Sequence, residues 1–496
     1  MARRGGIQHG GRALIAGIGV AVLGVSAAEG SLGPQNVLLL YNSQNAESLA
    51  VRNAYIAARP GVVQFDLNDA TITPGEIGRA VYLAKIRNPV KAFINGDGGG
   101  TDRSQQIMAI ATTRGLPAVL TGNNEFSNVS PWASLESELT LLQQDLETGS
   151  NPGQLPFRFN GIVDNPYHRM TGSTITGFSR AAVKTQRAFV NVESNPPGFQ
   201  TWSVSQLTPG GIYLVCRLDS APGPGAQTAV QNIQSLIERS LDLRVTPCAT
   251  QILLDEDAGA ILDAQGLAPR YPAIDDYLQT AIFMTPLGFR VVHDQTNNFI
   301  TGAELADQSR PLVALASYGE NHDLNGGENP PGPGSYLTTY GLHPAAMLIS
   351  LESYNGNSLI DGTQREDHAQ SLDFIALGGS FAICHVKEPF AFAVADMQML
   401  TLQLLSNGLT FAEAAYISIP GLSWQNTPIG DPLARVTIVP PALGDINCDA
   451  AVDVEDLYTF TANPVDVNGD FAINEADRIV VRHAVRAGEA VDVGRR

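Results

Sequence analysis

The chain has few cysteines, a deficit of positive charge and no long apolar run beyond its first residues. Four cysteines in 496 residues are too few for the disulfide framework of small secreted domains. Thirty Lys and Arg residues against 49 Asp and Glu residues give a formal net charge of −19, which argues against nucleic acid or an anionic membrane surface as a partner. No segment after residue 25 is apolar enough to predict a membrane span.

The N-terminus has the pattern of a secretory signal. Arg3, Arg4 and Arg12 precede a short uncharged apolar stretch at residues 13–25, and small residues follow at a suitable cleavage point. We therefore expect residues 1–28 to be a signal peptide. The mature protein would then be extracellular, bound at the cell surface or periplasmic, without a stable membrane span. An uncleaved anchor is the alternative.

The cysteines suggest little chemistry. Cys216 ends an apolar run and Cys248 follows the next expected helix, so one bridge between them is an alternative to free thiols. Cys384 and His385 are adjacent on an expected strand, where neighbouring side chains point to opposite faces. We expect Cys384 to be a core thiol, with His385 and Glu388 as candidate residues of a cleft.

Most of the chain alternates apolar runs with helical patterns. Expected strands lie at 36–41, 62–67, 91–95, 211–216, 250–254, 290–293, 311–316 and 345–350. Such alternation predicts an α/β fold, with a mostly parallel sheet flanked by helices. The expected main domain covers residues 29–439, with a loop-rich insertion at 149–209, and a Pro-containing linker follows at 440–444.

Two tandem stretches near the C-terminus predict calcium sites. Each has oxygen-bearing side chains at positions 1, 3, 5, 9 and 12 of a twelve-residue loop, and position 7 offers its backbone carbonyl. Calcium takes about six to eight oxygen ligands supplied in this way, and the crowded carboxylates repel one another without a cation. The predicted ligands of two Ca²⁺ ions are Asp445, Asn447, Asp449, Ala451, Asp453 and Asp456 in the first loop, and Asp466, Asn468, Asp470, Ala472, Asn474 and Asp477 in the second.

With Asp rather than Glu at position 12, these loops resemble the dockerin module, a pair of calcium-loop-and-helix units. The resemblance implies a small all-α calcium-binding domain over residues 445–493, which docks to a cohesin-like domain of another protein. The two loops begin 21 residues apart. The partner-reading pair at positions 10 and 11 is Val454-Glu455 in the first loop and Glu475-Ala476 in the second.

Polar side chains follow two of the expected strands of the main domain. Glu320 and His322 come after the strand at 311–316, and Glu352 and Ser353 come after the strand at 345–350. If these strands are neighbours, the four side chains converge at the carboxyl edge of the sheet, where ligands bind in open parallel sheets. His322 could then act as a base and Ser353 as a nucleophile, with a carboxylate orienting the histidine. A polar cluster that only caps the sheet is the alternative.

The same loops resemble the caspase–gingipain clan of cysteine peptidases. Tyr318-Gly319 stands where the clan has His-Gly, and the run from Ser353 to Gly356 matches a gingipain-style Cys-Val-Asn-Gly. Both catalytic positions have therefore changed. Residues 36–439 also resemble an uncharacterised family of exported bacterial proteins, through the starting strand at 36–42 and the final Gly-Asp431-Pro. That resemblance implies secretion and an α/β fold, and it assigns no activity.

Two functions are consistent with these patterns. The first is a secreted calcium-binding protein whose dockerin-like module mediates calcium-dependent docking, and whose main domain binds a ligand without chemistry. The second is a secreted hydrolase, peptidase-like or polysaccharide-related, that uses the rim formed by Glu320, His322 and Ser353.

Overall fold

A computed structural model describes most of the chain. The described residues are 32–121, 132–143, 163–165, 167–169, 188–189, 202–203, 212–256, 276–296, 299–319, 336–362, 368–388, 394–449, 451–465, 467–468 and 472–493. The chain contains two compact units, Glu29–Pro440 and Pro441–Arg496, and each is described by itself. The expected signal peptide and most of the expected insertion at 149–209 lie outside the described residues.

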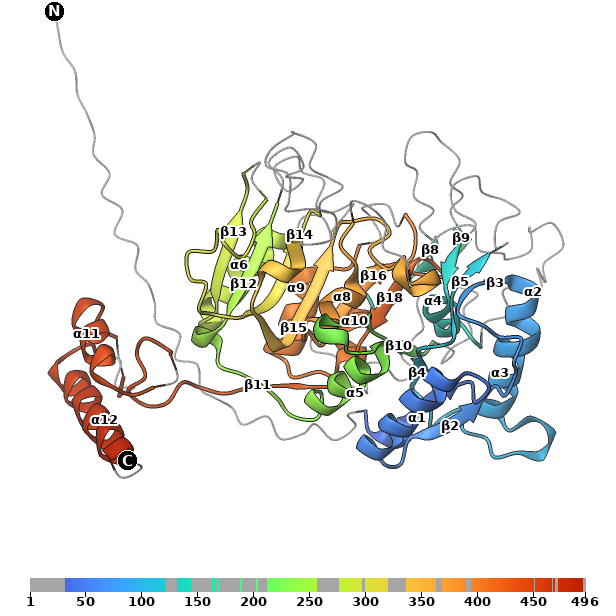
Figure 1. Ribbon diagram of the computed structural model, residues 1–496, viewed down its shortest axis with the longest axis horizontal. Helices are drawn as coiled ribbons and strands as arrows, with labels where there is room; N and C mark the ends of the chain where they lie inside the picture. Colours follow the sequence, from blue (N-terminus) through green and yellow to red (C-terminus); the bar gives the residue numbers. More distant parts are fainter. Residues whose placement is uncertain are drawn as a thin grey trace, which may run out of the picture. The chain divides into compact units, whose positions relative to one another are not determined.

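A mixed sheet flanked by helices forms the large unit (Figure 1). Among the described residues, ten strands pair in the order β13-β12-β14-β15-β16-β18-β10-β4-β1-β2. Neighbouring strands are parallel except β16 and β18, which confirms the predicted α/β fold with a mostly parallel sheet. The strands are β1 Val37–Tyr41, β2 Val63–Asp66, β4 Ala109–Thr113, β10 Leu214–Leu218, β12 Gln251–Asp255, β13 Arg290–Asp294, β14 Leu312–Ser317, β15 Leu342–Ser350, β16 Phe381–His385 and β18 Asn426–Ile429.

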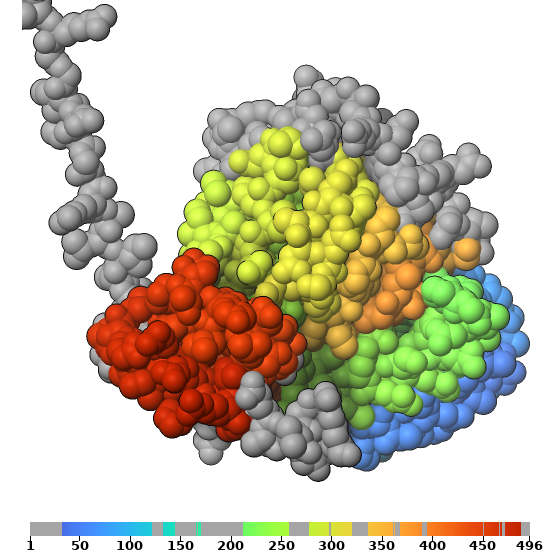
Figure 2. Space-filling model, turned by 60° about the vertical axis from the view of Figure 1, so that its left-hand side comes forward, coloured from blue at the N-terminus to red at the C-terminus, as the bar shows by residue number. Residues whose placement is uncertain are grey.

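In the described residues, shorter strands form four small sheets: β3 Gly75–Gly78 with β5 Pro117–Thr121 and β6 Ala133–Ser134, β11 Leu243–Val245 with β19 Val436–Ile438, β17 Gly421–Leu422 with β7 Val163–Asp164, and β8 Ala188–Phe189 with β9 Trp202–Ser203. The α-helices of this unit are α1 Ala46–Ala58, α2 Arg79–Tyr82, α3 Asn88–Asn95, α4 Leu135–Thr140, α5 Ala229–Arg239, α6 Asp276–Met284, α7 Ser358–Asp361, α8 Ser371–Ala376, α9 Met397–Leu405 and α10 Phe411–Ser418. Helices α1 and α5 contact each other, and their blue and green surfaces adjoin in Figure 2.

Strand β18 joins two half-sheets that run in opposite directions. The first half is β2-β1-β4-β10, and the second is β13-β12-β14-β15-β16. Because β18 is parallel to β10 and antiparallel to β16, the direction of the strands reverses between the halves. The carboxyl ends of the two half-sheets therefore lie at opposite edges.

Strands buried on both faces explain the continuous apolar runs of the sequence. In β1, Val37 and Leu39 belong to one buried cluster, whereas Leu38 and Leu40 belong to another. Successive side chains of a strand point to opposite faces, so helices must cover both sides of the sheet. A strand in this environment has no polar face, and its sequence shows no alternation.

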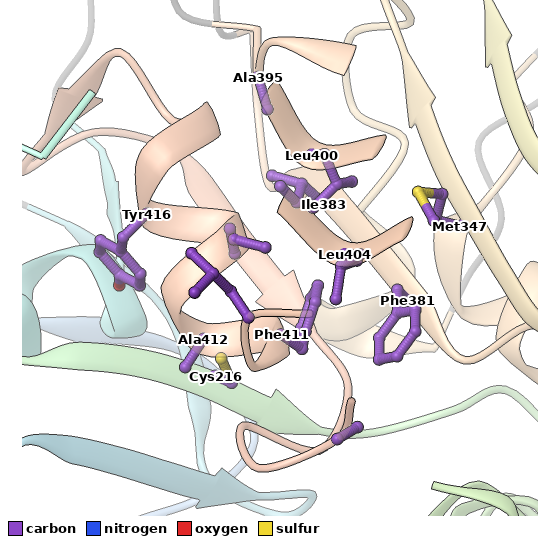
Figure 3. Close-up of a cluster of buried hydrophobic side chains, with 14 of the residues drawn as sticks. Cys216, Met347, Phe381, Ile383, Ala395, Leu400, Leu404, Phe411, Ala412 and Tyr416 are labelled. Atoms are coloured by element: carbon purple, nitrogen blue, oxygen red, sulfur yellow. The ribbon is translucent and has the colours of Figure 1, made fainter. Parts of the chain in front are cut away.

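Helices α9 and α10 cover part of one face (Figure 3). Phe411 of α10 stacks on Phe381 of β16, with ring centroids 4.7 Å apart and an interplanar angle of 27°. Helix α10 begins with a capping box, in which the Glu413 carboxylate accepts the Thr410 backbone N–H at 2.8 Å and the Thr410 hydroxyl accepts the Glu413 N–H at 3.4 Å. The cap satisfies backbone donors that would otherwise be buried unpaired.

A buried charge network lies where β10 meets its neighbours. The Arg217 side chain is 1% exposed, and it donates to the carboxylates of Glu136 and Asp219, each at 3.0 Å. Its remaining donors reach the backbone carbonyls of Leu116 at 2.8 Å and Pro117 at 3.0 Å. A charge is tolerated at this depth because each of these donors has an acceptor.

Asp431, in the Gly-Asp-Pro motif named above, links the segment after β18 to the end of helix α1. Asp431 is fully buried, and its carboxylate accepts from the Tyr55 hydroxyl at 2.8 Å. The Arg59 guanidinium donates to the other carboxylate oxygen from Nε at 2.9 Å and from Nη2 at 2.6 Å. Charge-assisted contacts of this kind fix both partners, so Asp431 has a structural role.

One expectation from the sequence is wrong, and one alternative is excluded. The segment 91–95, expected as a strand, belongs to helix α3, which has Pro89 in its first turn and buries Val90 and Ile94, four residues apart. Cys216 is a free, buried thiol, so it forms no bridge with Cys248, which is disulfide-bonded. Cys384 is also free and buried, as expected of a core thiol.

The C-terminal unit contains helices α11 Val454–Ala462 and α12 Glu475–Val493. Phe460 of α11 packs with Val481 and Val485 of α12 in a small buried cluster. Phe460 and Val481 are 21 residues apart, so they occupy equivalent positions in the two repeats. Within the part of the chain that the structure describes, no helix has both the length and the hydropathy needed to cross a membrane.

Candidate functional site

The strands that carry the predicted rim are neighbours. Strands β14 and β15 pair in parallel, and their last residues lie opposite each other. Residues that follow the two strands therefore share the carboxyl edge of the second half-sheet. Glu352 and Ser353 are described there, whereas Glu320 and His322 lie outside the described residues. The convergence of all four side chains stays a prediction.

Glu352 binds the loops at this edge together. It is fully buried, and its Oε1 accepts the Ala369 backbone N–H at 2.9 Å. Its Oε2 lies 3.3 Å from the Tyr336 hydroxyl and 3.4 Å from the Ser350 hydroxyl. Gly319 has a φ of +86°, and a Cβ there would lie 2.7 Å from Glu352 Cγ. Glycine is thus required beside Glu352, both for its backbone angle and for space.

Ser353 is only 3% exposed. His385 stands at the end of β16, the other neighbour of β15. The ring Nδ1 of His385 lies 3.4 Å from the Glu352 carbonyl, and the His385 backbone N–H donates to the Asn355 side chain at 2.6 Å. No hydrogen bond joins Ser353 to His385 among these described residues.

The His385 ring is held neutral in the interior. Its Nε2 is buried and has no hydrogen-bond partner in the described part of the chain. Burial lowers the pKa of His385 to about 4, because a desolvated imidazolium is unfavourable. Glu388, the other cleft candidate, is half-buried three residues further along. His385 is therefore a neutral, buried side chain that makes no hydrogen bond to Ser353 in the described part of the chain.

A second polar pair, which the sequence reasoning missed, lies at the same edge. His293 of β13 and Glu256, which follows β12, approach to 2.8 Å between Nε2 and Oε2, and their side chains are 14% and 7% exposed. Gln295 donates to the same carboxylate oxygen at 2.8 Å. In the sequence, Glu256 and His293 are each visible only as a polar residue at the end of an apolar run. The pairing of β12 with β13 brings the two side chains together.

The first acidic loop closes on the carboxylate of its twelfth residue. Asp456 Oδ1 accepts the backbone N–H groups of Ile446 at 2.6 Å and Asn447 at 3.1 Å. Its Oδ2 accepts the N–H of Asp453 at 2.9 Å. The carboxylate is inaccessible to solvent, and these bonds draw the ends of the loop together.

The second loop repeats this arrangement. Asp477 Oδ1 accepts from Val467 at 2.9 Å and Asn468 at 3.2 Å, and its Oδ2 accepts from Asn474 at 2.8 Å. The Asn474 amide, together with those of Val467 and Asn468, lowers the pKa of Asp477, because hydrogen bonds favour the charged carboxylate. Both twelfth residues thus make the same three bonds at equivalent positions.

The other ligand candidates of the first loop orient its backbone. The Asp449 N–H donates to Asp445 Oδ1 at 3.1 Å and to Asn447 Oδ1 at 3.0 Å. The Ala451 N–H donates to Asp449 Oδ1 at 2.8 Å. Asp453 caps helix α11. Side chains of this type stabilise tight turns by accepting from nearby amides.

The donor set of the two loops suits calcium. The predicted ligands of both loops are all oxygens, which hard cations such as Ca²⁺ prefer. In the described residues, no group of three or more carboxylate, imidazole or thiol side chains is arranged to hold a metal ion. Ala472 and Asn474 of the second loop are described, whereas Asp466 and Asp470 lie outside the described residues.

Comparisons with known proteins give one distant likeness. No protein-family model matches the chain, and no curated protein does. Among solved structures, the chain is similar to the crystal structure of the Arg-specific cysteine proteinase gingipain R, with a TM-score of 0.38 and 10% sequence identity over 83% of this chain and 81% of that one. A likeness of this degree says nothing about the activity of this protein.

Proposed function

We propose that the C-terminal unit is a calcium-dependent attachment module, and that the protein is exported with it. The observation that carries this proposal is the repeated closure of each acidic loop on Asp456 and Asp477. Two loops with equivalent bonds 21 residues apart favour one repeated binding unit over an accidental acidic turn. Each loop would hold one Ca²⁺ ion.

The charge of the loops supports calcium as the ligand. The first loop holds Asp445, Asp449, Asp453 and Asp456 within twelve residues. Carboxylates this close raise the free energy of the folded loop through mutual repulsion, and a divalent cation removes that penalty. Extracellular calcium is abundant enough to fill even weak loops, which suits an exported protein.

The resemblance to dockerins indicates what the module attaches to. We propose a cohesin-like protein as the partner, with the α/β unit as the attached ligand-binding part. The partner would contact residues at positions 10 and 11 of the loops. Val454 at position 10 is 42% exposed and lies beside the exposed Glu455 at the start of α11, so both are accessible to a partner.

Calcium binding can be measured directly on the full chain. Isothermal titration of chelator-treated protein with Ca²⁺ should give two bound ions, and the double variant Asp445→Asn/Asp466→Asn should bind at least about tenfold more weakly, because position 1 of each loop loses its charge. At a free calcium concentration of about 100 times the Kd, each bound ion should stabilise the unit by about 2.7 kcal/mol.

Glu455→Gln provides the control for this titration. It removes one negative charge from an exposed residue of the same unit that is outside the ligand set, so its calcium affinity should stay near that of the wild type. Identical heats with and without chelator treatment would reject the module as a calcium site.

A second candidate function is hydrolysis at the rim of the second half-sheet. The observation that favours it is the parallel pairing of β14 with β15, which puts the residues following the two strands at one edge. In this candidate, Ser353 is the nucleophile, His322 is the base, and Glu320 or Glu352 orients the base. The substrate would be a peptide or a polysaccharide-related compound.

Paired variants test this rim. The full chain should be screened for hydrolysis of peptide and glycoside substrates, and the Ser353→Ala and His322→Ala variants should each lower any detected kcat/KM by about 10²–10⁴-fold if the rim is catalytic. Full activity in both variants would exclude this site and leave Glu352 as a structural residue.

A further inference from the structure

The two half-sheets share one topology. In the first half, the chain runs from β1 outward to β2 and then crosses to β4 on the other side of β1. In the second half, it runs from β12 outward to β13 and then crosses to β14. Such a reversal of strand order is a topological switch point, beside which open parallel sheets bind their ligands at the carboxyl edge.

At the switch point of the first half-sheet, the charged side chains pair with one another. Arg114, which follows β4, lies 2.9 Å from the Asp219 carboxylate and 3.1 Å from the Glu47 carboxylate. Its Nη1 also donates to the Ser220 carbonyl at 3.1 Å. In the described part of this edge, Arg114 is thus paired with two carboxylates and is not available to a ligand.

The equivalent edge of the second half carries the pair formed by Glu256 and His293. Glu256 continues the pairing of β12 with β13, because its N–H donates to the Asp294 carbonyl at 3.0 Å. The contact of 2.8 Å between His293 Nε2 and Glu256 Oε2 is direct, and the His293 side chain is 14% exposed. This histidine is therefore held in place and still reached by solvent.

The hydrogen bond also sets the tautomer of the ring. A carboxylate oxygen only accepts, so Nε2 carries the proton in the neutral imidazole, and Nδ1 keeps the lone pair. Within the described residues, Nδ1 of His293 has no hydrogen-bond partner. A histidine oriented by a carboxylate through one nitrogen, with the other nitrogen free, is the arrangement of a general base.

This pair cannot serve Ser353. Strand β13 is separated from β15 by β12 and β14. Three strand spacings of about 4.8 Å place β13 and β15 about 14 Å apart. A base must lie within about 3 Å of the proton it takes, or act through one water. The pair is therefore a second candidate site, independent of the Ser353 rim.

We propose that Glu256 and His293 form a general-base dyad that hydrolyses a carboxylic ester at the carboxyl ends of β12 and β13, beside the switch point between β12 and β14. The proposal rests on the second candidate function, that the protein is a hydrolase. It assigns the reaction to Glu256 and His293 instead of Ser353 and His322. An ester fits a single base better than an amide does, because an alkoxide departs without prior protonation of a nitrogen.

The reaction needs only water. His293 Nδ1 takes a proton from a water molecule as its oxygen bonds to the acyl carbon, and the Glu256 carboxylate stabilises the imidazolium. The C–O bond of the tetrahedral intermediate then breaks, and Nδ1 returns the proton to the alkoxide. An acid and an alcohol are released.

Hydrolysis of glycerol triacetate by the full chain, followed as acid release at neutral pH, tests the dyad. This ester is not activated, so scattered surface imidazoles contribute little. His293→Gln should lower kcat/KM by about 10²–10⁴-fold, and Glu256→Gln should lower it by a smaller factor because the ring loses its anchor. His343→Gln is the matched control: His343 lies at the amino end of β15, on the opposite edge, and the variant should keep the wild-type rate.

Three outcomes would overturn the proposal. One is a wild-type chain that releases no acid, and another is a His293→Gln variant within about threefold of the wild type. The third is loss of hydrolysis in Ser353→Ala while His293→Gln stays active, which would keep the hydrolase candidate and reject the dyad. Calcium binding by the C-terminal unit is measured separately, so its success or failure does not depend on any of these results.

Discussion

Replacing Arg217 with methionine should lower the free energy of unfolding of the large unit by about 3–5 kcal/mol. Methionine fills a similar volume, but it leaves the buried carboxylate of Glu136 without its cation and leaves Asp219 paired with Arg114 alone. It also removes the donors to the carbonyls of Leu116 and Pro117. An unpaired charge in the interior is among the largest single-residue penalties in proteins.

Urea unfolding followed by tryptophan fluorescence measures this effect. The three tryptophans, Trp132, Trp202 and Trp424, all belong to the large unit, so the signal reports on that unit alone. Arg244→Met is the matched control, because Arg244 is 65% exposed and pairs with an equally exposed Asp242. An exposed pair contributes at most about 1 kcal/mol. Equal midpoints for the two variants would show that the Arg217 network is not a determinant of stability.

Replacing Asp456 with alanine should abolish the first calcium loop. The substitution removes the acceptor of three backbone N–H groups and one carboxylate ligand at the same time. Each unpaired, partly buried donor costs about 1–3 kcal/mol. We expect the unit to lose about 3 kcal/mol or more of stability and one of its two calcium ions, as measured by isothermal titration.

Asparagine at the same position separates the two contributions. Asp456→Asn keeps one oxygen that accepts from the backbone but removes the charge, so it should retain more of the fold than alanine and still bind calcium about 10–100-fold more weakly. The equivalent changes at Asp477 should give the same ranking in the second loop. Wild-type calcium stoichiometry in Asp456→Ala would contradict the assignment of this residue.

Much of the fold could be predicted from local patterns. The runs that became β1, β10, β12, β14 and β15 are mostly apolar, because a strand covered by helices on both faces has no exposed side. Segment 91–95 is the end of helix α3 and not the predicted strand, because a short apolar run does not distinguish a strand from the end of a helix. The proline at its beginning was the better signal.

The candidate sites were predictable to a smaller extent. Repeated acidic loops are local in sequence, so their ligand candidates could be named in advance. The order of the strands is not local: nothing in residues 250–294 states that β12 and β13 pair, and Glu256 and His293 are 37 positions apart. The insertion of β18 between β16 and β10 was equally hidden, because it depends on residues far apart in the chain.

The late position of β18 in the chain has a consequence for synthesis. Its residues, Asn426–Ile429, lie between two strands that were made much earlier, β10 and β16. Until they leave the ribosome, both inner borders of the half-sheets have unpaired backbone groups, and open strand borders promote aggregation. The central sheet of this protein therefore cannot close until β18 has been synthesised, and the borders of both half-sheets stay open until then.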